Sequence, residues 1–179
     1  MGFSAFLILG AVLAALVLHE QWAAYRLRSM KWDEIVDQLQ PIPFRSLETI
    51  ALDHLQPGAN QTHLEATDMW VMIGGLEGLE RMRHNADLII ALAAHVRHWN
   101  FTEGVIVAER IRQDSILLKR ALRRIEFEQL FVKLFDPKHL RSPFYVHQAS
   151  SAYYLMRQRL LLLYEHHQFV LYPRLAEML

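Results

Sequence analysis

The first eighteen residues contain no charged side chain, and the stretch from Phe3 to Leu18 is almost wholly apolar. A helix over this stretch would be about 24 Å long, slightly short of the roughly 30 Å hydrocarbon core of a bilayer. Continuation as far as Tyr25 reaches spanning length and brings Trp22 to the interface, where aromatic rings are favoured. The pattern predicts a retained single transmembrane helix, with its membrane anchor formed by Phe3, Phe6, Leu7, Leu9, Val12, Leu13, Leu16, Trp22 and Tyr25.

Two other interpretations of this stretch stay open. A cleaved signal peptide normally has a basic start and a small-residue cleavage site, but no charged side chain precedes the run and His-Glu-Gln-Trp follows it. A helix buried in a soluble core is the other, because apolar runs of this length occur there too. Within a membrane, the small residues Ser4, Ala11 and Ala15 lie roughly on one side and favour close packing against another helix.

Basic residues near the two ends of the span predict its orientation. None precedes the apolar run, whereas Arg26, Arg28 and Lys31 follow it closely. Because basic residues are enriched on the cytoplasmic side, we expect the N-terminus outside and the C-terminal domain in the cytoplasm, in a bacterial inner membrane.

Helical spacing dominates the rest of the chain, which predicts an all-α fold. Trp32, Ile35, Val36 and Leu39 form an i, i+3, i+4, i+7 stripe, which Pro41 and Pro43 end. A short helix is expected over 46–55. Thr62 and Glu65 match a capping box and predict that the next helix begins there and runs to Ile73.

Three long helices follow. The break at Gly74-Gly75 precedes a helix over 76–99, Thr102 is placed to cap the second, and the third is expected over 143–167. The third contains four consecutive leucines, 160–163, a run that is apolar all round, so we expect this helix to be the central buried one. Inward positions on the first two helices are predicted to be Leu76, Leu79, Met82, Ala86, Ile89 or Ile90, Ala93, Val96, Ala108, Ile111, Ser115, Leu118, Leu122 and Ile125.

The expected organisation is therefore an anchor over 1–28, a linker with short helices over 29–60, and an antiparallel helical bundle over 61–179 with three long and several short helices. Pro173 is expected to leave only a short tail.

The composition limits the classes of partner and of chemical site that can be expected. The 19 basic and 19 acidic residues give zero net charge, so no overall field attracts nucleic acid. The absence of cysteine excludes disulfides, thiolate catalysis and sulfur-based zinc sites. No small-molecule substrate is indicated.

Ten histidines raise the question of metal or cofactor binding. His95 and His98, and likewise Glu80 and His84, have spacings that place two ligands on one helix face. His19, near the end of the predicted span, is a candidate ligand for haem or a pigment. However, a di-iron bundle needs Glu-x-x-His, which this sequence lacks. Local hydrogen bonding at helix surfaces is the preferred interpretation, and no cofactor is predicted.

One dense basic cluster and a group of tyrosines are candidate contact surfaces. The cluster comprises Lys119, Arg120, Arg123 and Arg124, and suits anionic lipid or a partner, although a solvated face with i, i+4 pairs is the simpler account. Tyr153 and Tyr154 are expected either in the core or at an interface.

No sequence motif specifies catalysis. Gly74-Gly75-x-x-Gly78 has neither a preceding strand nor a following Gly-Lys-Ser/Thr, so a break between helices explains it better than a phosphate loop. We therefore expect a non-catalytic, membrane-anchored helical protein whose partners are the lipid bilayer and other membrane subunits or further copies of itself. A histidine-ligated electron-transfer or pigment-binding subunit, and a membrane-anchored regulator, are the alternatives.

Overall fold

The computed structural model describes residues 10, 26–27, 29–55, 64–96, 103–135, 143–167 and 170–179. The residues predicted to form the membrane anchor and its small-residue face lie outside the described part, as do His19, Arg28 and His98. Their roles stay predictions. In the part that is described, no helix is both long enough and apolar enough to cross a membrane.

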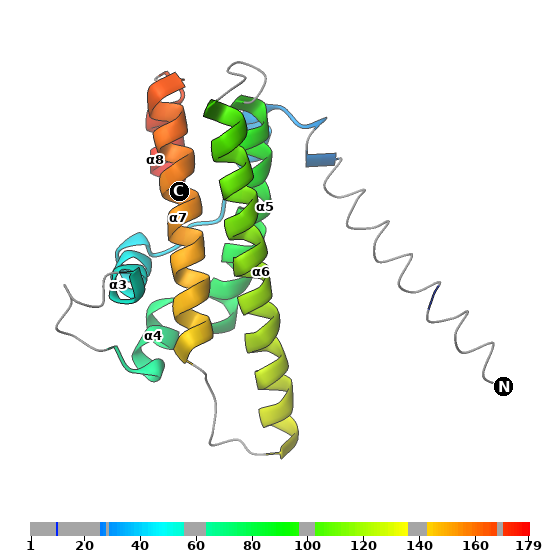
Figure 1. Cartoon of the computed structure of the whole chain (residues 1–179), viewed down its shortest axis with the longest axis vertical. Coiled ribbons are helices and arrows are strands. Elements are labelled where there is room, and N and C mark those ends of the chain that lie inside the picture. The colour runs from blue at the N-terminus through cyan, green and yellow to red at the C-terminus, as the bar shows by residue number, and fades with distance from the viewer. Residues whose placement is uncertain are drawn as a thin grey trace.

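The described residues form seven helices and no strand, which confirms the predicted all-α bundle (Figure 1). Three helices are long and four are short. In chain order they are α2 (Trp32–Val36), α3 (Phe44–Leu55), α4 (Ala66–Met72), α5 (Gly75–Val96), α6 (Glu103–Phe135), α7 (Pro143–His167) and α8 (Tyr172–Met178).

The three long helices lie side by side, with α6 running opposite to α5 and α7 (Figure 1). Two contacts fix the antiparallel register of α6 and α7: Asp114 forms an ion pair with Arg159, and Glu103 lies 3.6 Å from the Nε2 of His167. The inward faces follow the predicted spacing, since Met82, Ile89 and Leu118 are fully buried. Leu76 is an exception at 44% exposed.

Helix α7 is the centre of the bundle, as predicted, because it contacts α3, α4, α5, α6 and α8. Its leucine run is apolar all round but is not buried on every side. Leu160 is fully buried, whereas Leu162 is 52% exposed. Since successive residues on a helix are rotated by about 100°, one of the four leucines turns away from the core even here.

The segment predicted as a linker belongs to the bundle. Ile35, Val36, Leu47 and Ile50, from α2 and α3, are buried in the same core cluster as the long helices. The reason is that α3 also has one apolar face, and this face packs along α7.

The start of α4 differs from the prediction. The helix begins at Ala66 with Glu65 at its N-cap, so Thr62 does not open it. The predicted break is confirmed: Gly74 and Gly75 have φ values of +80° and +63°, which glycine adopts without strain. Gly78 is required by close approach, because a Cβ there would lie 1.6 Å from the carbonyl oxygen of Ile73.

The C-terminal tail is a helix rather than an irregular end. Pro173 lies in the first turn of α8, where a missing N–H costs nothing, so it starts this helix instead of only stopping the previous one. Leu175 and Leu179 are buried and attach α8 to the core.

Candidate functional site

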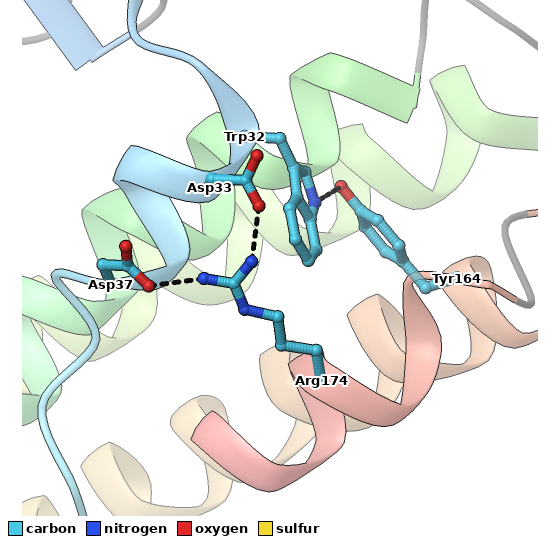
Figure 2. A network of polar contacts seen from close by, with 5 residues as sticks. All are labelled: Trp32, Asp33, Asp37, Tyr164 and Arg174. Carbon is cyan, nitrogen blue, oxygen red and sulfur yellow. Dashed lines mark hydrogen bonds and ion pairs between the residues drawn. The ribbon is translucent and has the colours of Figure 1, made fainter.

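The contacts that fasten α2 to the C-terminal end of the bundle form the most developed polar network of long sequence range (Figure 2). We call this network the clamp; it comprises Trp32, Asp33, Asp37, Tyr164 and Arg174. Helix α2 begins directly after Lys31, the last of the three basic residues that follow the predicted transmembrane helix. The clamp therefore holds the segment that leads out of the predicted span.

One half of the clamp is aromatic, with Tyr164 buried and Trp32 half-buried. The indole Nε1 of Trp32 donates to the Tyr164 hydroxyl oxygen at 2.9 Å, and that hydroxyl donates to the Leu92 carbonyl at 3.1 Å. The two rings lie 6.3 Å apart in a tilted arrangement. Burial raises the pKa of Tyr164 well above its ordinary value, although the bond from Trp32 opposes this. Tyr164 is therefore neutral, and the hydrogen bonds of its hydroxyl link α7 to α2 and α5.

The other half is ionic and exposed. The guanidinium of Arg174 in α8 reaches Asp33 at 2.5 Å through Nη1 and Asp37 at 2.6 Å through Nη2. Its Cζ also lies 5.6 Å from the centre of the Trp32 ring. Exposed ion pairs contribute little each, but a forked guanidinium that bridges two carboxylates fixes a geometry.

A second polar contact holds the chain that follows α2. Asn85, buried on α5, accepts from the Gln40 backbone N–H at 2.9 Å and donates to the Gln40 carbonyl at 2.7 Å. Its amide nitrogen also lies 3.1 Å from the Tyr153 hydroxyl. The neighbouring His84 and Arg81 contact the carbonyl oxygens of Gln38 and Pro41 at 3.2 Å each. These side chains supply the partners that an irregular segment lacks within its own backbone.

The interface between α3 and α7 contains the densest group of titratable side chains. His147 on α7 lies between two acceptors, with Nδ1 at 3.4 Å from the Ile50 carbonyl and Nε2 at 3.6 Å from Asp53 Oδ2. The ring of His54 lies 5.5 Å away. Burial lowers the pKa of His147; the Ile50 carbonyl and Asp53 act in the opposite direction.

This group does not have the geometry of a Ser-His-Asp triad. Ser150 and Ser151 are buried nearby in sequence, but neither hydroxyl has a hydrogen-bond partner in the described part of the chain. Both ring nitrogens of His147 already face oxygen acceptors other than these hydroxyls. A serine nucleophile needs a ring nitrogen within hydrogen-bond reach, so the arrangement explains fastening of α3 to α7 rather than acyl transfer.

Arg157 completes the same interface. It is only 9% exposed, and its Cζ lies 3.8 Å from the centre of the Phe44 ring. Burial lowers the pKa of Arg157, whereas Tyr153 and Glu48 raise it; a guanidinium nevertheless keeps its proton. The cation–π contact adds a further link between the start of α3 and α7.

The predicted metal pairs are only partly within the described residues. Glu80 is exposed and pairs with Arg83 at 3.4 Å, and His84 contacts Gln38, so the structure does not bring these two candidates together on an ion. His95 has a buried Nε2 with no partner among the described residues. No group of three His, Asp or Glu side chains suited to a metal occurs in the part that the structure describes.

The residues predicted to contact lipid or a partner lie in different environments. Lys119 is used inside the molecule, where its Nζ pairs with Asp87 at 2.6 Å, whereas Arg120, Arg123 and Arg124 are exposed. Tyr153 is fully buried, which places it in the core and not at an interface, and burial raises its pKa to about 12. Tyr154 is half-buried and stacks on Phe44 at 6.2 Å.

Sequence reasoning missed the clamp and Asn85. One signal was available for Asn85, because it is a polar residue on the buried face of a periodic helix, between Met82 and Ala86. No comparable signal marks Arg174, which is one of several arginines with ordinary surroundings in the sequence.

The comparisons with known proteins give no relative: no family model, no curated protein and no solved structure matches this chain.

Proposed function

We propose that this chain is a non-catalytic, membrane-anchored helical protein that serves as an accessory or scaffolding subunit of a membrane complex. Its N-terminal helix spans a bacterial inner membrane once, with the bundle on the cytoplasmic side. Assembly of several copies into a structural component is included in this proposal.

The clamp is the observation that carries this proposal. The apolar first eighteen residues specify an anchor, and the clamp attaches the segment after that anchor to helices at the other end of the chain. A bundle fastened in this way keeps a fixed relation to the residues that leave the membrane. A scaffold needs such a relation, because a freely hinged bundle would not present its surface to a partner in a defined orientation.

Exposed apolar side chains support a role in assembly. Helix α6 alone exposes Val105, Ile106, Ile116, Leu117 and Phe127. Apolar side chains grouped on one outer helix are typical of contact surfaces.

Membrane association is tested with the full-length chain. Wild-type protein expressed in a bacterium should stay with the membrane fraction after an alkaline carbonate wash. The variant Leu9→Arg/Leu13→Arg should leave it, because each central arginine disfavours insertion by about 3 kcal/mol. The matched control Leu9→Ile/Leu13→Ile should be retained. Loss of the wild-type protein from washed membranes would overturn the proposal.

Assembly is tested after extraction in mild detergent. Light scattering should give a mass above that of one chain, or a pull-down from native membranes should recover a membrane protein in constant proportion. A strictly monomeric preparation with no co-purifying subunit contradicts the scaffolding role.

His95 favours a second candidate function. Its Nε2 is buried and has no partner among the residues that the structure describes, and such a nitrogen can ligate a haem or pigment, which is the chemistry of an electron-transfer subunit. Metal analysis and an absorption spectrum of protein purified from native membranes test this candidate. A colourless, metal-free preparation removes it.

A further inference from the structure

The second half of α6 presents three exposed arginines. Arg120, Arg123 and Arg124 are exposed and form no ion pair with any residue that the structure describes. Their neighbours differ, because Lys119 pairs with Asp87 and Glu126 pairs with Arg83, both across the contact with α5. The pairing of the flanking residues leaves a local excess of positive charge on the outer side of the helix.

Apolar side chains lie among these arginines. Ile116 and Leu117 are each 41% exposed, and Phe127 is 57% exposed. Positions 116, 120, 123 and 127 follow an i, i+4, i+7, i+11 spacing, so they share one face of the helix. We call Ile116, Leu117, Arg120, Arg123, Arg124 and Phe127 the α6 basic surface. It combines cations with apolar side chains, as interfacial helices do.

Anionic lipid is the occupant that this surface fits. Its excess of positive charge is complementary to the phosphates of anionic lipid headgroups, and the cytoplasmic leaflet carries such lipids. The apolar side chains among the arginines suit the boundary between headgroups and acyl chains.

The anchor predicted from the sequence supplies proximity to that surface. About 15 residues separate Leu18, the last residue of the apolar run, from Asp33, and an extended chain covers at most about 3.5 Å per residue, so the clamp lies within roughly 50 Å of the end of that run. Helix α6 is itself 33 residues long. The bundle is therefore tethered at a distance comparable to its own dimensions.

We propose that the α6 basic surface lies on anionic lipid headgroups of the membrane that holds the N-terminal helix. The arginines contact phosphates, and Ile116 and Phe127 enter the boundary between headgroups and acyl chains. This inference rests on the proposed function, because it requires the anchor. It adds a second membrane contact that orients the bundle.

Single-cysteine labelling tests this contact directly, since the natural chain has no cysteine. Full-length Ile116→Cys carries a polarity-sensitive fluorophore and is reconstituted in phosphatidylcholine vesicles with or without phosphatidylglycerol. Val71→Cys on α4, where the native side chain is 77% exposed, is the matched control. Spin-labelled lipid should quench the label at 116 about twofold more strongly in anionic vesicles, and high salt should weaken the effect. The label at 71 should not respond.

Charge variants identify the residues responsible. Arg120→Gln/Arg123→Gln/Arg124→Gln should abolish the anionic-lipid effect, whereas the control Arg45→Gln/Arg110→Gln/Arg112→Gln, with the same loss of charge, should keep it. Equal quenching at 116 in both kinds of vesicle overturns the inference. So does its persistence in the first triple variant. Disulfide-linked dimers of unlabelled Ile116→Cys, together with no lipid quenching of the labelled protein, also overturn it and assign the surface to a second copy.

Retention of each variant after an alkaline carbonate wash is scored separately. A chain that stays in the vesicles without quenching at 116 refutes this inference alone. A wild-type chain that washes off refutes the proposed function and this inference together.

Discussion

At the scale of single residues, polar side chains inside the bundle decide how irregular segments are held. Asn85 replaces a backbone partner for both the N–H and the carbonyl of Gln40. His147 instead links two helices, because its ring nitrogens on α7 face the Ile50 carbonyl and the Asp53 carboxylate of α3. Each of these side chains is costly to bury without its partners, so each specifies one arrangement of the chain around it.

Removal of the Asn85 amide should destabilise the fold strongly for a single side chain. We expect Asn85→Ala to lower the free energy of unfolding by about 2 kcal/mol, because two buried backbone groups lose their partner and a small cavity forms. Urea unfolding followed by circular dichroism measures this change. The exposed neighbour-helix control Gln113→Ala should stay within about 0.5 kcal/mol of wild type. Equal effects of the two substitutions would show that the amide contributes nothing specific.

His147 should make stability depend on pH. Burial lowers its pKa below the ordinary value of 6.5, so the folded state favours the neutral ring. The unfolded chain binds the proton more readily, so the stability that the neutral His147 ring contributes is complete above pH 6.5. This stability is lost as pH falls through the lowered pKa. The midpoint of thermal unfolding should fall on acidification, and less steeply in His147→Asn. The exposed control His166→Asn should follow the wild-type curve. Identical slopes for wild type and His147→Asn would contradict the assignment.

At the scale of helices, the periodic pattern predicts the elements well but not their neighbours. Helix α7 has the predicted bounds, since Pro143 starts it and the apolar spacing continues to its end. Its surroundings come from five other helices, which leave one side open at Leu162. The four leucines therefore differ in burial because of how α7 packs, although the residues are identical.

Matched substitutions in the leucine run measure that difference. Leu160→Ala should cost about 2–5 kcal/mol of unfolding free energy, because a fully buried side chain leaves a cavity among several helices. Leu162→Ala removes the same atoms from a side chain that is 52% exposed, so it should cost about 1 kcal/mol or less. Urea unfolding measures the loss of unfolding free energy in each variant, and the two variants have the same amino-acid composition. Similar losses in both variants would mean that Leu162 is buried against something other than the described residues.

At the scale of the whole molecule, the clamp joins segments separated by more than 130 residues. The chain that leaves the predicted membrane span is thereby tied to the last helix. Such a contact costs chain entropy to close, and the exposed ion pairs offset only a small part of that cost. The part-buried Trp32–Tyr164 contact and the core residues of α2 and α8 supply the remainder.

Arg174 should therefore affect local motion more than global stability. We expect Arg174→Gln to lower the unfolding free energy by about 1 kcal/mol or less, because both ion pairs are exposed. Hydrogen exchange in α2 and α8 should nevertheless become severalfold faster. Without the Arg174 ion pairs, these short helices can open locally without first breaking a contact between them. Exchange in α5 should not change. The exposed arginine variant Arg45→Gln serves as the control and should leave α2 and α8 at wild-type rates.

The sequence alone determined the helical class, the limits of α7 and the break at Gly74-Gly75, because these depend on residues close together in the chain. It also indicated most of the buried faces, since one face follows from local periodicity. For the candidate site, the sequence predicted the basic cluster. It did not predict that Lys119 in this cluster pairs with Asp87 inside the molecule.

Only the tertiary structure decided that 29–55 belongs to the core, that Arg174 bridges Asp33 and Asp37, and that Tyr153 is buried while Leu162 is exposed. These outcomes depend on how each helix is rotated and placed against distant ones. Several rotations satisfy the same apolar spacing, and the choice among them is made by packing and by polar partners far away in the sequence.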